Sequence, residues 1–345
     1  MTVVCTGIDE AGLGPLLGPL SIIAVTARTA DDAMLGKLFR KARTGIKDSK
    51  QIHTSGDIAP IEQMALAAIA WLTGSIPATA ADCFALLGET ADARTPVPWM
   101  HGAESMRLPI AATRIPRWHI PDIEPVQLRG ALVQPDRFNA AVKAGINKAD
   151  LELSVIQNLL QTLPPDAARF VTIIDRLGGR RYYRNFLETV WVGATTMATD
   201  EAHPEISGYH LRVGSAEHRV SFCVDGESIS PLTATASCIA KYARELHMLL
   251  LNRYWCERMP ALKPTAGYTL DARRWIEQLG ERQRRDARGR AARSARFQGL
   301  EHQRALFRRR DQEHRKPADR LPLREAHLLR RGQDRDRQRH VREPH

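Results

Sequence analysis

The sequence predicts an α/β protein, in which short apolar strands alternate with amphipathic helices along 345 residues. Runs of β-branched and other apolar residues, such as Phe170–Ile174, are typical of buried strands. Between such runs, apolar residues recur at helical spacing, as at Ile61, Ala65, Ala68 and Leu72. A chain of this length is expected to form one or two domains.

The expected elements follow from these patterns in chain order. The first half contains strands over 3–8 and 21–26, then helices over 31–40 and from Ser55 or Asp57 to about 72. Recurrent prolines over 73–125 favour an insertion with one short helix at 81–87. The second half is expected to contain a strand over 126–132, helices over 135–144 and 148–163, a central strand over 170–174, a mixed region over 183–224, and helices over 232–254 and 270–279.

The basic charge is confined to one end of the chain. The segment 281–345 contains 20 Arg, one Lys and ten acidic residues, so it carries the whole net charge of +11. The remainder is neutral, and its charge does not indicate a polyanionic partner. Three interpretations of the Arg-rich segment stay open: a tail that binds nucleic acid non-specifically, a solvated disordered appendage, or an out-of-frame product of a GC-rich gene.

Composition also limits the class of protein. The longest apolar run, Met64–Leu72, is too short for a membrane span, and we expect neither a membrane partner nor a secretory signal. The five cysteines are scattered without a zinc-binding spacing. We therefore expect structural thiols in a cytoplasmic protein.

Two adjacent carboxylates, Asp9 and Glu10, end the first expected strand and precede a glycine-rich turn. Neighbouring strand residues point to opposite faces, but both carboxylates can reach one small volume where a strand ends. Crowded carboxylates repel one another, and a hard divalent cation between them removes the repulsion. An exposed acidic corner is the alternative. Gly12 and Gly14, which permit φ > 0 and close backbone approach, favour the metal site.

A second carboxylate follows the same pattern. Asp175 comes directly after the buried strand 170–174 and is followed by the pair Gly178 and Gly179. A carboxylate thus stands twice where a strand meets a glycine turn.

Five stretches together identify a family resemblance. They are Gly-Ile-Asp-Glu-Ala-Gly-Leu-Gly-Pro at 7–15, Asp-Ser-Lys at 48–50, Ile-Ile-Asp at 173–175, the helix at 231–245, and Gly-Tyr-Thr at 267–269. In this order they resemble the motifs of the type 2 ribonucleases H (ribonuclease HII). The resemblance covers residues 1 to about 280, which we expect to form the catalytic domain, with 281–345 as a tail.

The resemblance implies a ribonuclease H-like fold, in which helices flank a mixed central sheet. It also implies hydrolysis of the RNA strand of RNA–DNA hybrids by two divalent ions, Mg²⁺ or Mn²⁺, leaving 5′-phosphate and 3′-hydroxyl ends. Two metals about 4 Å apart activate the attacking water and stabilise the leaving oxygen. Asp9, Glu10 and Asp175 would be ligands. A monomer is expected.

The fourth acid departs from the family pattern. Counting back from Lys241 places the family's aspartate at Glu227, and Asp225 lies two residues earlier. Glutamate is one methylene longer and can still bind a metal. We assign Glu227, with Asp225 as the alternate.

A second departure is Leu13, where the family has an arginine between the two glycines. Leucine cannot donate to a phosphate. Cleavage of longer hybrids is still expected, whereas the sequence leaves open whether single embedded ribonucleotides are cut. The resemblance also implies substrate contacts from backbone groups of Gly12 and Gly14 and from four side chains: Ser49, Lys50, Lys241 and Tyr268.

Two other functions remain to be compared. Leu13 and Glu227 also fit a catalytically weak or inactive relative that binds nucleic acid. A nucleotide-binding loop over 12–18 is disfavoured, because Pro15 interrupts the glycine spacing and no helix is expected to start there.

Overall fold

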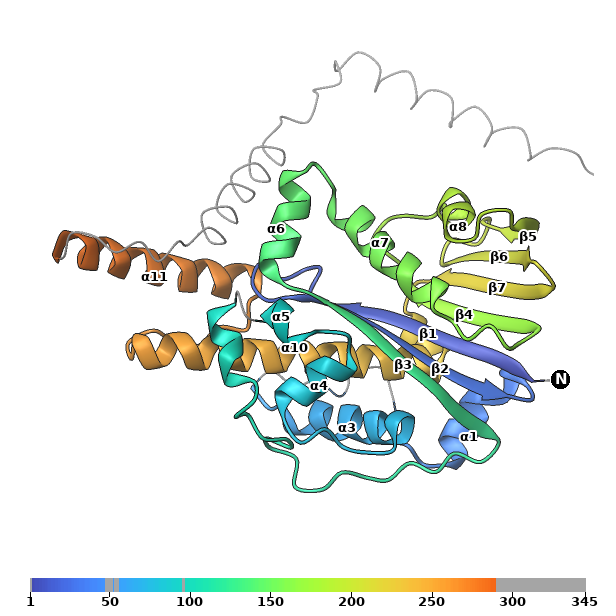
Figure 1. Cartoon of the computed structure of the whole chain (residues 1–345), viewed down its shortest axis with the longest axis horizontal. Coiled ribbons are helices and arrows are strands. Elements are labelled where there is room, and N and C mark those ends of the chain that lie inside the picture. The colour runs from blue at the N-terminus through green and yellow to red at the C-terminus, as the bar shows by residue number, and fades with distance from the viewer. Residues whose placement is uncertain (1, 47–51, 53–55, 95–96, 290–345) are drawn as a thin grey trace, which may run out of the picture. The chain divides into compact units, whose positions relative to one another are not determined.

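The computed structural model describes residues 2–46, 52, 56–94 and 97–289, except the side chains of 281–289 (Figure 1). The chain divides into two compact units, Met1–Ser294 and Ala295–His345, and the second lies outside the described residues. The predicted domain boundary at residue 280 falls inside a helix, and the proposed division into a catalytic domain and a tail stays a prediction.

The described residues form a seven-stranded mixed sheet with the order β3-β2-β1-β4-β7-β6-β5. Strands β1, β4 and β7 are parallel, and the remaining neighbours are antiparallel. The α/β class predicted from the sequence, with a mixed central sheet flanked by helices, is confirmed. The strands are β1 (Val3–Ala11), β2 (Leu20–Thr29), β3 (Ile123–Val133), β4 (Arg169–Asp175), β5 (Thr195–Asp200), β6 (Ile206–Val213) and β7 (Ala216–Cys223).

Helices cover both faces of the sheet. The helices are α1 (Leu35–Lys41), α3 (Ala59–Thr73), α4 (Ala80–Leu86), α5 (Ala91–Arg94), α6 (Pro135–Lys143), α7 (Lys148–Gln161), α8 (Arg184–Val190), α9 (Gly226–Ile229), α10 (Pro231–Arg258) and α11 (Thr269–Gly289), with 3₁₀ turns η1 (Asp32–Met34) and η2 (Pro98–Gly102). One apolar core joins α1, α3, α4 and α10 to one face. A second core joins α7 and α8 to the other (Figure 1).

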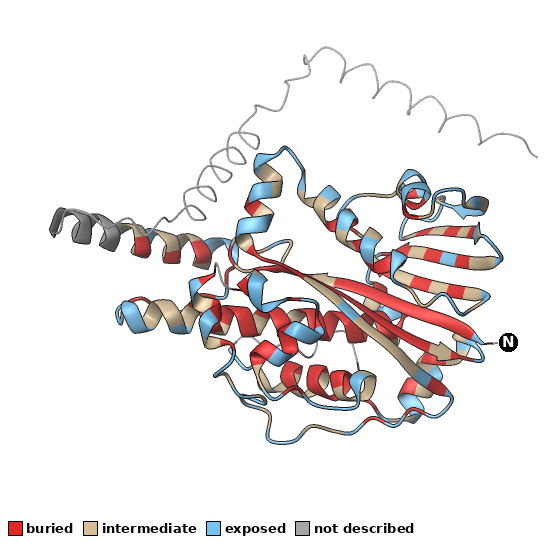
Figure 2. Cartoon of the chain, viewed as in Figure 1, coloured by how far each residue is buried: buried red, intermediate tan, exposed pale blue. Residues whose placement is uncertain are grey.

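Helix α10 is the central helix of the first core. Ser230 caps it by accepting from the Thr233 N–H, and Pro231 occupies its first turn. Its N-terminal half is buried on nearly all sides (Figure 2). Gly7 of β1 makes this packing possible, because a Cβ there would lie 2.1 Å from the Thr233 backbone nitrogen. The helix therefore approaches β1 at the level of the acidic residues.

The segment predicted as an insertion, 73–125, is anchored to this core by a buried carboxylate. Glu62 of α3 accepts from the backbone N–H groups of Ile110, Ala111 and Ala112 at 2.7 to 2.8 Å, and from the Tyr242 hydroxyl at 2.8 Å. The expected helix at 81–87 is α4, which carries a capping box at Thr79.

Three sequence expectations are corrected. Strand β1 extends to Ala11 rather than ending at Ile8, because its pairing with β2 continues. Helical spacing predicts a face with Leu151, Val155 and Leu159 for the helix over 148–163, but the buried face of α7 contains Glu152, Ile156 and Leu159. Helix α11 ends at 289 rather than 279, because a single glycine inside a helix costs only about 1 kcal/mol.

Within the described residues, none of the helices combines the length and the apolar character needed to cross a bilayer.

Candidate active site

Asp9 and Asp175 lie beside each other on the parallel strands β1 and β4. The ladder between these strands ends at Ile8 and Ile174, so each aspartate is the next residue beyond it. Asp9 is only 6% exposed. Burial, followed by the charges of Asp175 and Glu227, raises its pKa well above the usual range, so these carboxyl groups share one low-dielectric neighbourhood.

Two polar side chains on α10 connect these acids to the positive charge of a lysine. Ser237 hydrogen-bonds the Asp9 carboxyl group, and Lys241 Nζ donates to Ser237 Oγ at 3.2 Å. Ser237 and Lys241 are four residues apart and therefore share one helix face. Lys241 also pairs with Glu227 Oε1 at 3.3 Å. This pairing brings the predicted lysine and the predicted fourth acid together.

Glu227 and Asp225 occupy different positions around α9. The Glu227 side chain is 8% exposed and close enough to raise the pKa of Asp9. Asp225 is exposed and adopts φ of +52°, in the left-handed region, immediately before the helix. The Gly226 N–H between them donates to Asp175 Oδ1 at 2.8 Å. The structure therefore brings Glu227, and not Asp225, to the buried side of the acidic group.

Glu10 leaves β1 on the other side from Asp9. The two residues pair with Ile22 and Ile23 of β2, and regular alternation along the strand directs neighbouring side chains to opposite faces. Burial, and then the charge of Asp175, raise the pKa of Glu10, while the charges of Lys241 and Arg244 on α10 lower it. Glu10 therefore shares an electrostatic neighbourhood with Asp175 and α10, and the expectation that both acids reach one volume stays a prediction.

Carboxylate oxygens are the ligands that a hard divalent cation prefers. Burial raises the pKa values of Asp9 and Glu10, because a negative charge is unfavourable in the interior, and a bound cation would offset that charge. Across the described ranges, however, no three His, Cys, Asp or Glu side chains converge as a ready-made metal site. Two of these carboxyl groups also accept hydrogen bonds: Asp175 from the Gly226 N–H, and Glu227 from Lys241. An ionised carboxylate has further lone pairs available for an ion.

The glycine-rich loop after β1 is held by the C-terminal part of the fold. The Leu16 and Leu17 N–H groups donate to the Gly267 carbonyl at 2.9 and 3.2 Å. Arg244, 3% exposed, donates to the carbonyls of Leu17 at 3.2 Å and Ala266 at 2.9 Å. The first and last predicted motifs are consequently in contact.

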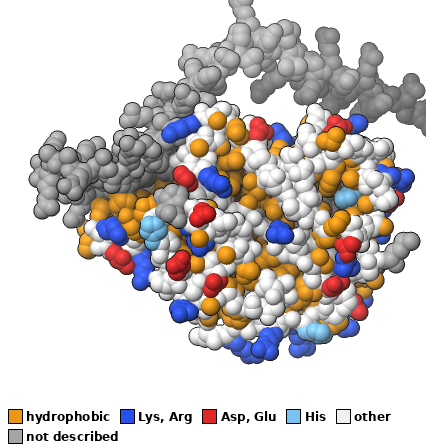
Figure 3. All heavy atoms as spheres, viewed as in Figure 1, with side chains coloured by type: hydrophobic (Ala, Val, Ile, Leu, Met, Phe, Trp, Pro, Cys, Tyr) orange, Lys and Arg blue, Asp and Glu red, His pale blue; other side chains and the backbone are white. Residues whose placement is uncertain are grey.

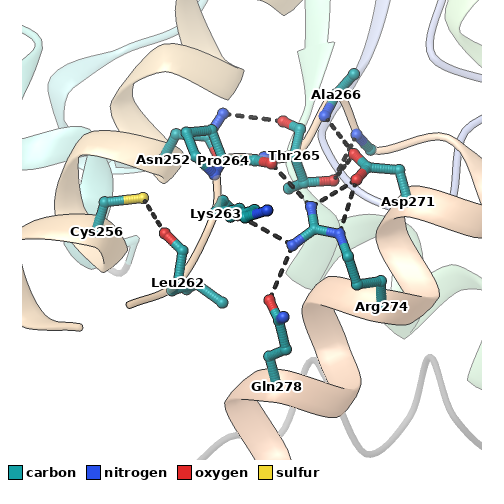
Figure 4. A network of polar contacts seen from close by, with 11 residues as sticks. Asn252, Cys256, Leu262, Lys263, Pro264, Thr265, Ala266, Asp271, Arg274 and Gln278 are labelled. Carbon is teal, nitrogen blue, oxygen red and sulfur yellow. Dashed lines mark hydrogen bonds and ion pairs between the residues drawn. The ribbon is translucent and has the colours of Figure 1, made fainter. Parts of the chain in front are cut away.

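Figure 4 shows how the 262–266 turn is fixed between α10 and α11. Asn252 and Thr265 exchange two hydrogen bonds of 2.9 Å. Asp271 accepts from Thr265 Oγ1 at 2.6 Å and from Ala266 N–H at 2.8 Å. Burial acts to raise the pKa of Asp271, but hydrogen bonds from Thr265, Arg274 and Ala266 outweigh it and lower the pKa. The turn is a fixed support for the next residues, Gly267 and Tyr268.

Tyr268 lies on this support with 54% of its surface exposed, and the Arg244 guanidinium lies 5.2 Å from its ring centre. Gly12 adopts φ of +115°, as the sequence predicted, whereas Gly14 is exposed and has no positive φ. The predicted contacts Ser49 and Lys50 lie outside the described residues.

No protein-family model and no curated protein matches this chain. Solved structures similar to it include the ribonuclease HII of Archaeoglobus fulgidus, from its complex with PCNA, at 17% identity over 81% of this chain and 88% of that one, with a TM-score of 0.42. The ribonuclease H2 of Pyrococcus horikoshii is 16% identical over 89% of this chain and 99% of that one, with a TM-score of 0.43. The Bst ribonuclease HIII in complex with Mn²⁺ is 18% identical over 89% and 71%, with a TM-score of 0.41. These are ribonucleases H of types HII and HIII, the group that the sequence motifs resemble.

Three residues of this region had no assigned role in the sequence interpretation. Ser237 lies four residues after Thr233, and Arg244 lies seven residues after Ser237. This helical spacing could have placed both residues on the side of the helix near the strand end. The sequence interpretation gave Glu152 no role, because the helical spacing of Leu151 and Val155 predicts a different buried face. The spacing of Glu152, Ile156 and Leu159 contains the signal.

Proposed function

We propose that this protein is an endoribonuclease that hydrolyses the RNA strand of RNA–DNA hybrids with the help of divalent metal ions. Asp9, Glu10, Asp175 and Glu227 are the proposed catalytic and metal-binding acids. The products carry 5′-phosphate and 3′-hydroxyl ends. The observation that carries the proposal is the buried placement of Asp9 beside Asp175 and Glu227, which raise its pKa.

Asp9, Glu10, Asp175 and Glu227 would hold Mg²⁺ or Mn²⁺. Bound ions would supply an activated water and stabilise the leaving oxygen. Lys241 keeps Glu227 against the acidic group through its 3.3 Å ion pair. Ser237 hydrogen-bonds Asp9 and so fixes the orientation of this buried carboxylate.

Groups suited to substrate surround the acids on one side. The backbone of Gly12 and Gly14 offers polar groups to a sugar, and the exposed Tyr268 ring offers a stacking surface. Lys241, with 25% of its side chain exposed, can contact a phosphate, and Ser49 and Lys50 are further proposed contacts. On the face shown in Figure 3, charges of both signs are interspersed over the described residues, so local groups rather than a broad basic face would position the hybrid.

The test is cleavage of an end-labelled RNA–DNA hybrid by the full-length protein with Mg²⁺ or Mn²⁺. We expect cleavage by the unmodified chain, loss of cleavage in Asp9→Asn, and retention in Asp150→Asn, which changes an exposed carboxylate on α7. Cleavage by Asp9→Asn at the unmodified rate would overturn the assignment.

The weak or inactive relative is separated by the same experiment. Hybrid binding without cleavage in either metal would establish it and overturn the enzymatic proposal. We also place the protein in the cytoplasm, because its five cysteines are free thiols, as expected in a reducing compartment.

A further inference from the structure

Glu152 is a buried acid that the proposed chemistry has not used. It lies on the inner face of α7 beside Leu153 and Ile156 and is 2% exposed. Within the part of the chain that the structure describes, its Oε2 atom has no hydrogen-bond partner. A buried polar atom without a partner is costly, so α7 packing alone gives no reason for an acid here.

Another buried glutamate shows what a structural carboxylate looks like in this fold. Glu62 is fully buried, but three backbone N–H groups and a tyrosine hydroxyl donate to it. Four donors compensate its charge. Glu152 lacks such a set, and its charge must be balanced in another way.

The charges around Glu152 belong to the candidate active site. After burial, the charges of Glu10 and Asp175 are the causes that raise the pKa of Glu152 to about 8. Like charges near one another demand either protons or a cation. Glu152 is therefore electrostatically part of the same acidic group.

Hydrogen bonds also connect α7 to the loop that follows Glu10. Glu10 Oε2 accepts from the Leu13 N–H at 3.3 Å, and the Leu13 carbonyl accepts from Lys148 Nζ at 3.3 Å. Lys148 lies one helical turn before Glu152 on α7 and so shares its face. The face of α7 that carries Glu152 therefore lies beside the loop that follows Glu10.

We propose that Glu152 is a fifth acidic residue of this centre, a positioning residue that acts through Glu10 and strengthens binding of a divalent cation. The inference rests on the proposed function, because it presumes that Asp9, Glu10 and Asp175 hold the ion. It adds α7 as a second wall of the centre, on the face of the sheet opposite to α10.

The experiment measures thermal unfolding of the full-length protein in EDTA and across a Mn²⁺ titration, without substrate. For Glu152→Gln we expect the unfolding temperature in EDTA to rise by about 2–4 °C, because a buried acid is removed. We expect the Mn²⁺ concentration for half-maximal stabilisation to rise about tenfold. Glu152→Leu fills the same space with apolar atoms and should give both shifts if the amide variant does not fold.

Glu62→Gln is the matched control. It removes a buried charge on α3, a helix that contributes none of the proposed acids, and should lower the unfolding temperature in EDTA while leaving the Mn²⁺ midpoint unchanged. An unchanged Mn²⁺ midpoint in both Glu152 variants would overturn the role of Glu152 alone. If Mn²⁺ does not stabilise the unmodified protein, or stabilises Asp9→Asn equally, the metal centre of the proposed function fails as well.

Discussion

Replacing Arg244 by methionine should disconnect the glycine-rich loop from the turn that carries Tyr268. The guanidinium group donates to the carbonyls of Leu17 and Ala266, and it is 3% exposed. Methionine keeps the apolar length of the side chain but donates to neither carbonyl. The perturbation therefore removes the connection while leaving α10 with a good helix former.

The expected magnitude follows from these two contacts. Hydrogen bonds from a charged donor contribute about 1.5–3 kcal/mol each. The variant no longer has to bury the guanidinium charge, and this gain reduces the total loss. Burial already lowers the pKa of Arg244, which shows that this cost is real. We expect a loss of about 2–4 kcal/mol in the free energy of unfolding, and a fall in the unfolding temperature of about 5–10 °C.

The functional effect should be larger than the effect on stability implies. A displacement of about 1 Å in groups that position a substrate can cost about 100-fold in rate. The assay is kcat/KM for hybrid cleavage at a temperature where the variant is folded. Arg253→Met is the control on the same helix, because its surface pair with Glu257 is exposed and contributes less than about 1 kcal/mol. Unmodified kcat/KM and unfolding temperature in Arg244→Met would refute the reasoning.

Three further changes test other parts of the structure. Gly267→Ala should lower the free energy of unfolding by about 1–3 kcal/mol and impair hybrid cleavage. The reason is that Gly267 has a φ of +83° and a Cβ there would lie 2.6 Å from the Leu17 carbonyl oxygen. An unchanged thermal melt would contradict this. Glu62→Gln should lower the free energy of unfolding by about 2–4 kcal/mol through the 109–112 loop, and cleavage at 25 °C should be unaffected; lost cleavage by the folded variant would refute the structural role. In EDTA, stability should fall as pH rises from about 4.5 to about 8, by up to about 5 kcal/mol, because folded Glu152 retains a proton that the unfolded chain loses. The slope of unfolding temperature against pH should flatten in Glu152→Gln, and an identical slope would exclude this origin.

Local patterns were sufficient for most of the fold. β-Branched runs, helical spacing and caps are properties of neighbouring residues, and they predicted β4 at 170–174 and α10 from 232 within one residue at their starting ends. The apolar stripe of α10 was also predicted, since Ala236, Ile239 and Ala243 are all buried. The same local signals failed at β1, whose end depends on how far β2 continues to pair.

The acids of the candidate site were predicted because each stands beside a local signal. Asp9 and Asp175 follow apolar strands, and the parallel ladder between β1 and β4 makes them neighbours. The motif count assigned Glu227 and kept Asp225 as the alternate, without a structural basis for the preference. That choice depends on the backbone at Gly226, which leaves Asp225 exposed and directs Glu227 to Lys241.

The sequence by itself determined which chemical groups are present: carboxylates after strands, a glycine turn and a lysine on a helix. What only the tertiary structure decided is which of these groups meet. The face on which Glu10 lies depends on strand register, and the contact of the glycine loop with Gly267 joins residues some 250 positions apart. The charge around Glu152 arises from two strands that α7 reaches only in the folded chain. Long-range packing sets these relationships, and periodicity within a short window carries no information about them.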